Sequence, residues 1–242
     1  MGIANAYSRI IRRQLEQHAA WPPVTNVFAL GDFGVVSNGI FTRMGNIADL
    51  GVTWKEKEGP PSKLDYKSTS VVTTRFEAGA KVDVFSDSVT IDAKLVFRFK
   101  RESTFVLKAP KITSREIDDV FAVAAKLHAI PSWRWRYRFV TRVYSAETPL
   151  IIANREGGTE VTISGKAAAL KKIEFGDAAV DIGVTTDRHL SLEVTGQSGV
   201  IGLGLGRVRV AGAVGEAGQA GAKNEIGVEE DTDWDSDEVD DI

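Results

Sequence analysis

The sequence predicts an α+β fold, in which a twisted antiparallel sheet with long amphipathic hairpins packs against a few helices. The first observation is that apolar and polar side chains alternate over residues 71–100, which is typical of β-strands. The second is the helical spacing of apolar residues near the N-terminus and again over 117–129. The third is the number of Gly-containing turn signals between apolar segments. We expect a single domain over 1–211, followed by a Gly/Ala linker and an acidic tail over 212–242.

The chain is expected to begin with a basic amphipathic helix over about residues 3–19. Its apolar positions repeat three or four residues apart, and Pro22 and Pro23 end it. Three arginines flank the apolar stripe, namely Arg9, Arg12 and Arg13. Such a helix suits docking on a sheet or lying on an anionic membrane surface. In residues 28–52 glycines spaced among apolar residues predict short strands with tight turns, and a polar loop follows over 55–67.

Residues 71–100 predict one long antiparallel hairpin with an apolar and a charged face. Ser86, Asp87 and Ser88 supply turn chemistry between arms of about 13 residues, whereas a typical strand has about five or six. The apolar face is either the core of a soluble sheet or a surface that moves into a bilayer, which a tilted strand crosses with about 9–11 residues. The candidate membrane-inserting residues of this hairpin are Val72, Phe76, Val82, Val84, Val89, Ile91, Ala93, Leu95, Phe97 and Phe99.

A strand over 104–107 and a second helix are expected after the hairpin. Thr113 and Glu116 have the spacing of a capping box, and apolar residues at helical spacing continue to about residue 129, before Pro131. The neighbouring acids at 118 and 119 suit the start of a helix.

The next segment alternates aromatic residues with arginines and is expected to form a strand over 133–139. Its rings then share one face and its guanidinium groups the other. Amphipathic rings and arginines also collect at bilayer interfaces, and they bind single-stranded nucleic acid where they surround one groove. Alternation on opposite faces disfavours the nucleic-acid interpretation. The candidate membrane-binding residues here are Trp133, Arg134, Trp135, Arg136 and Arg138.

A second hairpin-like region is expected over 161–184, followed by strands near 190–194 and 200–210. Its candidate membrane-inserting residues are Val161, Ile163, Val180 and Ile182.

Charge is divided unevenly along the chain. The net charge is −3, but ten of the 33 acidic residues lie at or after Glu225, where there is no Lys or Arg. The preceding part therefore carries 23 acidic against 30 basic residues, a net charge of about +7. A basic body suggests an anionic partner. The acidic tail is interpreted either as a disordered solubilising segment or as a segment that folds back over a basic face until it is removed.

Catalytic chemistry is poorly supported, and we expect no enzyme, cofactor or metal site. His18, His128 and His189 are isolated and lack metal-ligand spacing. The chain has no Cys, which excludes disulfides and thiol chemistry, and it has no nucleophile elbow or P-loop. No run of 18 apolar residues is present, so a transmembrane helix is not expected.

The layout of the chain resembles that of the bacterial gasdermin-like pore formers. The resemblance is carried by the alternating residues 71–100, by 161–184 at the place of a second inserting hairpin, and by two short motifs. These motifs are Leu30, Gly31 and Asp32, and Arg43, Met44, Gly45, Asn46 and Ile47. That family often has a lipid-modified Cys near the N-terminus, which this chain lacks. The resemblance implies a cytoplasmic, autoinhibited protein of antiviral defence in bacteria, released when a protease removes a C-terminal segment.

The leading hypothesis is therefore a pore-forming protein that oligomerises on anionic membranes through two amphipathic β-hairpins. It would move from the cytoplasm to the inner membrane, with lipid, further copies of itself and an activating protease as partners. The alternative is a non-enzymatic structural or binding subunit of a larger assembly, in which the alternation is plain sheet core. A nucleic-acid-binding module is a weaker third interpretation.

Overall fold

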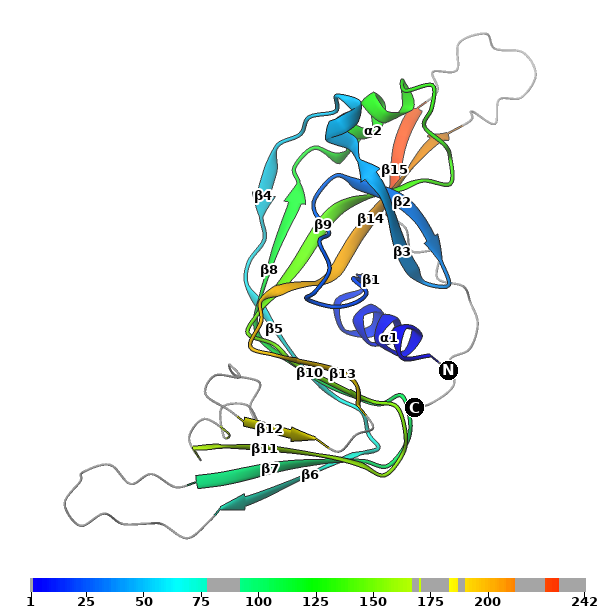
Figure 1. Ribbon diagram of the computed structural model, residues 1–242. Helices are drawn as coiled ribbons and strands as arrows, with labels where there is room; N and C mark the ends of the chain where they lie inside the picture. Colours follow the sequence, from blue (N-terminus) through cyan, green and yellow to red (C-terminus); the bar gives the residue numbers. More distant parts are fainter. Residues whose placement is uncertain are drawn as a thin grey trace, which may run out of the picture.

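The computed structural model describes residues 2–77, 92–166, 170, 183–186, 190–211 and 225–230. The described chain is mostly antiparallel sheet, with two α-helices and one short 3₁₀-helix (Figure 1). The predicted combination of strands and helices is therefore present, but β-sheet makes up most of the described structure.

The larger sheet has 11 described strands and curls along the length of the molecule (Figure 1). Its central strands are long, and β8, β9 and β14 pair antiparallel side by side. The strands of this sheet are β1 (His18–Ala19), β2 (Asp32–Ser37), β3 (Ile40–Asn46), β4 (Glu56–Glu58), β5 (Ser62–Lys67), β8 (Phe105–Ile117), β9 (Arg138–Glu147), β10 (Leu150–Asn154), β13 (Leu190–Thr195), β14 (Gly199–Ala211) and β15 (Glu225–Glu230).

Helix α1 (Ile3–Leu15) lies in the curl of this sheet (Figure 1). Its apolar stripe is buried against β5, β8, β10 and β14, as amphipathic spacing predicts. Tyr7 is fully buried in that cluster, and its hydroxyl donates a hydrogen bond to the Ile201 carbonyl oxygen at 3.0 Å. The helix ends at Leu15, about four residues before the expected end, because the chain enters β1 at His18.

Helix α2 (Val120–His128) packs at the other end of the large sheet, near β14 and β15 (Figure 1). The predicted capping box is wrong, because Thr113 and Glu116 lie in β8, which runs on to Ile117. The cap is Asp119, whose Oδ1 accepts a hydrogen bond from the Ala122 amide at 2.9 Å. The expectation that an acid caps this helix is thus confirmed. The short helix η1 (Ile47–Leu50) follows β3.

The smaller sheet has four described strands in the order β12, β11, β7, β6. They are β6 (Val71–Glu77), β7 (Asp92–Phe99), β11 (Thr159–Lys166) and β12 (Gly183–Thr186). One face of this sheet packs on β8, β10 and β13 of the large sheet and forms a separate apolar core with them. Among the described helices, none is long and apolar enough to cross a membrane.

Strand β15 lies in the acidic segment that was interpreted either as a disordered tail or as a segment that folds back over a basic face. Residues 225–230 of this segment pair antiparallel with β14 from Gly206 to Ala211. Val228 packs against the core below α2. Apolar residues at alternate positions, 226 and 228, give this acidic segment a β-strand pattern, so it can pair with an available strand edge.

Candidate functional site

The two predicted hairpins lie side by side in the small sheet. In the first, β6 and β7 pair from Val71 opposite Phe99 to Glu77 opposite Ala93. Strand β11 pairs with the other edge of β7, and β12 pairs with β11. Figure 1 shows these strands projecting together from the end of the molecule opposite α2. The sequence predicted both hairpins, while their adjacency follows only from the fold.

On β7 and β11 the inner face of the small sheet is apolar and buried, while β6 adds the half-buried Thr73 and Arg75, which lie opposite Phe97 and Leu95. Phe97 is 1% exposed, and it packs with side chains of β8, β10 and β13. Every described candidate residue on this face is 3% exposed or less, namely Ala93, Leu95, Phe97, Phe99, Val161 and Ile163. In the folded chain these residues are therefore core, as the soluble-sheet interpretation expects.

Two candidate inserting residues lie on the other face. Alternation along the hairpin predicted one face for Val72, Phe76 and Phe97. The register instead places Val72 opposite Arg98 and Phe76 opposite Lys94. Val72 is 38% exposed and Phe76 is 50% exposed. This grouping was wrong because directly opposed residues share a face, and alternation within each arm does not fix the register between arms.

The outer face also carries Val96, which lies opposite Thr74 and is 4% exposed, together with polar and charged groups. Arg98 of β7 forms an ion pair with Glu160 of β11, with 2.7 Å between Arg98 Nε and Glu160 Oε2. Both side chains are well exposed, so this pair adds little stability and places charge on the outer face. The remaining candidates Val82, Val84, Val89, Ile91, Val180 and Ile182 lie outside the described residues.

The predicted membrane-binding arginines fall into two separate groups. On α1, Arg13 is exposed, whereas Arg9 and Arg12 are half-buried and engaged in polar or charged contacts within the protein. Residues 131–137 lie beside α2, at the end of the molecule opposite the small sheet (Figure 1). Helix α1 lies between these two ends. The structure thus does not bring the two groups together.

Residues 133–137 are not a strand, contrary to the alternation. Strand β9 begins only at Arg138, and the Tyr137 amide donates to the Arg134 carbonyl oxygen at 2.9 Å, which closes a turn. Trp133 packs on Phe33 and Tyr137, with ring centroids 5.5 Å apart in each pair. Trp135 points away and is 78% exposed. The expected separation of rings and guanidinium groups on opposite faces is therefore wrong.

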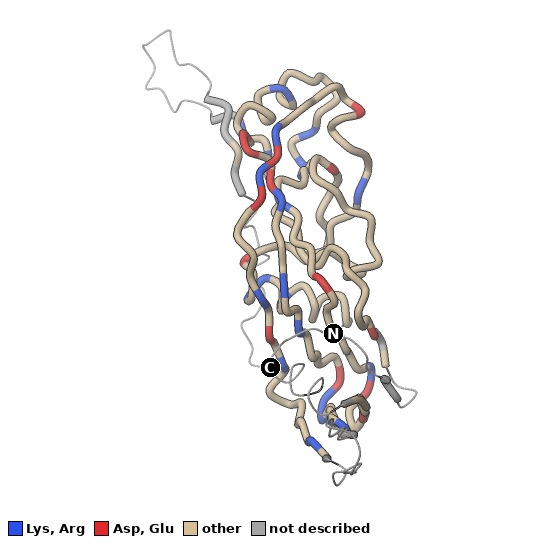
Figure 2. Tube along the Cα trace, turned by 90° about the vertical axis from the view of Figure 1, so that its left-hand side faces the viewer, with Lys and Arg blue, Asp and Glu red and all other residues tan. Residues whose placement is uncertain are grey.

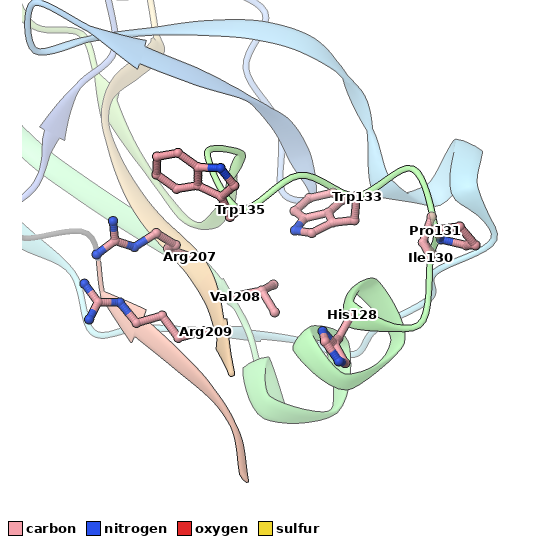
Figure 3. A pocket seen from close by; sticks show the side chains of 8 residues that line it. All are labelled: His128, Ile130, Pro131, Trp133, Trp135, Arg207, Val208 and Arg209. Carbon is pink, nitrogen blue, oxygen red and sulfur yellow. The ribbon is translucent and has the colours of Figure 1, made fainter. Parts of the chain in front are cut away.

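A pocket of about 620 Å³ opens between this turn and the end of β14. The pairing of β14 with β9 ends at Gly206 opposite Phe139, while β14 continues to Ala211 beside β15. Figure 3 shows Arg207 and Arg209 extending from β14 on the side of Trp135, with His128 of α2 at the other end. The lining residues are His128, Ile130, Pro131, Trp133, Trp135, Arg207, Val208 and Arg209. The alternation of Arg207, Val208 and Arg209 is a basic strand signal that the sequence analysis did not use.

The two short motifs of the gasdermin-like resemblance meet in one polar network. Asp32 is 1% exposed; its Oδ1 accepts from Asn46 Nδ2 at 2.9 Å and pairs with Arg43 Nε at 2.8 Å, while Oδ2 accepts from the Ala29 amide at 2.9 Å. The hydrogen bond to Asp32 raises the pKa of Arg43. The motifs therefore tie β2 to β3, and their role here is structural.

Positions of Lys and Arg are interspersed with positions of Asp and Glu along the chain in Figure 2. Ion pairs join them, including Lys111 to Glu147 at 2.7 Å and Arg115 to Glu56 at 3.4 Å. A lipid or nucleic-acid surface is thus better sought on α1 or near residues 131–137 than where these ion pairs lie.

The described residues contain no group of three His, Asp or Glu side chains placed to hold a metal ion. Comparison of the sequence with protein-family models and with curated proteins finds no match. The function is therefore argued from the arrangement of the residues themselves.

Proposed function

We propose that this chain is an autoinhibited membrane-permeabilising protein, in an α+β fold whose two amphipathic hairpins form the inserting unit. The observation that carries the proposal is the small sheet, in which both hairpins adjoin, with an inner face that is apolar on β7 and β11 and an outer face that carries charged residues such as Arg98 and Glu160. Such a sheet suits a bilayer when the inner face turns to lipid and the outer face to water.

For the small sheet to leave the protein core at a tolerable free-energy cost, its inner face must move from that core into lipid. Burying a large apolar side chain contributes about 1.5–3 kcal/mol, so exposing Leu95, Phe97, Phe99 and their neighbours on β11 to water would cost on the order of 10 kcal/mol. Lipid restores that contribution, whereas water does not. The sheet is therefore expected to leave the body only at a membrane surface.

Oligomerisation follows from the strand edges. Among the described strands, β6 and β12 each pair with one neighbour in the small sheet and so form its edges. An unpaired backbone edge is not tolerated in hydrocarbon, so an inserted sheet must pair with the sheets of further copies. We propose homo-oligomers that assemble on anionic lipid, which the arginines of α1 and of the segment around Trp135 recruit.

The C-terminal segment is the proposed brake. Strand β15 pairs with the edge of β14, and Glu229 lies opposite Arg207 in the register. Removing the segment uncovers this edge and takes away negative charge that competes with anionic lipid. The proposal includes a cytoplasmic resting form, an activating protease and transfer to the inner membrane, in bacterial antiviral defence.

Dye release from lipid vesicles tests the proposal. A recognition site for a specific protease is placed between 212 and 224, and cut and uncut proteins are compared on anionic and neutral vesicles. We expect release only from the cut protein on anionic vesicles. The matched control carries the same inserted site and is treated with inactivated protease.

The alternative is a structural or binding subunit in which the small sheet remains core. It is favoured by the burial of the apolar residues of β7 and β11 against the large sheet. Vesicles that stay intact with folded, cut protein would support this alternative and contradict the pore-forming proposal.

A further inference from the structure

We propose that the pocket between β14 and residues 130–135 binds a phosphorylated ligand with a planar ring, of the size of a mononucleotide. The proposal does not depend on the membrane activity above. It rests on the pocket's volume, on the types of side chain that line it and on their arrangement along its length.

The pocket exists because two neighbouring strands separate. Beyond Gly206, β14 has no pairing on its β9 side among the described strands, since the chain before Arg138 turns away through hydrogen-bonded turns. The space between them is about 620 Å³, and ligand sites commonly measure about 300–1,000 Å³. A mononucleotide fits such a space, whereas a single inorganic ion would leave most of it empty.

The lining groups combine positive charge with aromatic surface. Arg207 and Arg209 stand two residues apart on β14, and their guanidinium groups extend in the same direction in Figure 3. Guanidinium groups match the geometry of phosphate oxygens and bind them with paired hydrogen bonds. The described lining residues include no Asp or Glu, so a cationic ligand finds no counter-charge among them. Both arginines have contacts within the protein, and a phosphate would share the guanidinium groups with those contacts.

The two indole rings supply a place for the planar part. Trp133 is fixed by its contacts with Phe33, Tyr137 and Phe139, whereas Trp135 is 78% exposed at the mouth of the pocket. Because most of its ring is exposed beside the pocket, Trp135 can stack on a base. Ile130, Pro131 and Val208 complete an apolar wall. The phosphate is thus expected near the arginines and the ring near the tryptophans.

Binding of four nucleoside 5′-monophosphates to the full chain tests the inference, with tryptophan fluorescence and calorimetry as readouts. Adenosine carries the ring alone, ribose 5-phosphate carries the phosphate alone, and a short single-stranded DNA represents a polymer. We expect a mononucleotide to bind at least about tenfold more tightly than either half-ligand, because both parts of the site are then used. No mononucleotide binding at about 1 mM, or equal affinity for a half-ligand, would overturn the proposal.

Variants separate the two parts of the site. Trp135→Ala should weaken mononucleotide binding at least about fivefold and leave ribose 5-phosphate unchanged, since stacking is lost. Arg209→Gln should weaken both ligands, because it removes a phosphate contact. Arg136→Gln removes the same charge from an exposed residue outside the lining and serves as the matched control. If Arg136→Gln weakens binding as much as Arg209→Gln, or if only the DNA binds, the ligand is held by the general basic surface and the pocket assignment is wrong.

Discussion

Replacing one phenylalanine on each face of the first hairpin tests the register of the small sheet. Phe97 of β7 is 1% exposed in the core between the two sheets, whereas Phe76 of β6 is 50% exposed on the outer face. Truncating a fully buried Phe to Ala costs about 3–5 kcal/mol through lost burial and the remaining cavity. Half-burial of Phe76 contributes about 1 kcal/mol, because full burial of such a side chain contributes about 1.5–3 kcal/mol.

The two variants, Phe97→Ala and Phe76→Ala, are compared by urea unfolding with tryptophan fluorescence. For an m-value of about 2 kcal/mol/M, Phe97→Ala should lower the midpoint by about 2 M and Phe76→Ala by about 0.5 M. A domain with a free energy of unfolding of about 5–15 kcal/mol has room for either loss. Equal shifts, or a larger shift for Phe76→Ala, would refute the register and the division into inner and outer faces.

Three further predictions concern the fold and the C-terminal strand. Asp32→Asn should lower the free energy of unfolding by about 1.5–3 kcal/mol, because the buried carboxylate loses charge-assisted bonds to Arg43 and Asn46. The exposed control Asp49→Asn should change the free energy of unfolding by less than about 0.5 kcal/mol in the same urea assay. Burial raises the pKa of Tyr7 above its ordinary value of 10.0, so the folded state keeps the proton that the unfolded state loses. The free energy of unfolding should therefore fall as pH rises above 10, by up to about 1.4 kcal/mol per pH unit. The Tyr7→Phe variant cannot ionise at this position, so its free energy of unfolding should fall less between about pH 8 and pH 11. Equal falls in the two proteins would contradict this prediction. A disulfide between Val208→Cys and Val228→Cys, which are opposed in the register, should form because opposed Cα atoms lie about 4.5–5.5 Å apart, and it should hold β15 in place. Cut protein with this disulfide should release dye only after reduction, and release without reductant would contradict the role of β15 as the brake.

The sequence predicted the existence of most elements because their signals are local. Helical spacing in residues 3–15 and alternation in β6, β7 and β11 are properties of each segment alone, and the structure has these elements. The acid at the start of α2 was also predicted correctly. The resemblance motifs around Asp32 and Asn46 were noticed as sequence features, while their shared network depends on the pairing of β2 with β3.

The errors arise where a neighbour in space decides the outcome. The faces of Val72 and Phe76 depend on the register with β7, which no local pattern specifies. The aromatic and arginine alternation before Arg138 had strand character, yet hydrogen-bonded turns prevail there. The pairing of residues 225–230 with β14 and the assembly of the pocket lining from α2, the following turn and β14 also depend on contacts between segments distant in the sequence.

The most direct test of the central claim asks which face of the small sheet meets lipid. Thr73 and Thr74 are adjacent half-buried residues of edge strand β6; Thr73 lies opposite Phe97 on the inner face, and Thr74 lies opposite Val96 on the outer face. The chain has no native Cys, so Thr73→Cys and Thr74→Cys each carry one fluorophore. With cut protein on anionic vesicles that contain a lipid-linked quencher, we predict strong quenching at position 73 and little at position 74. Equal quenching, or none at either position, would contradict insertion of the small sheet with its inner face toward lipid.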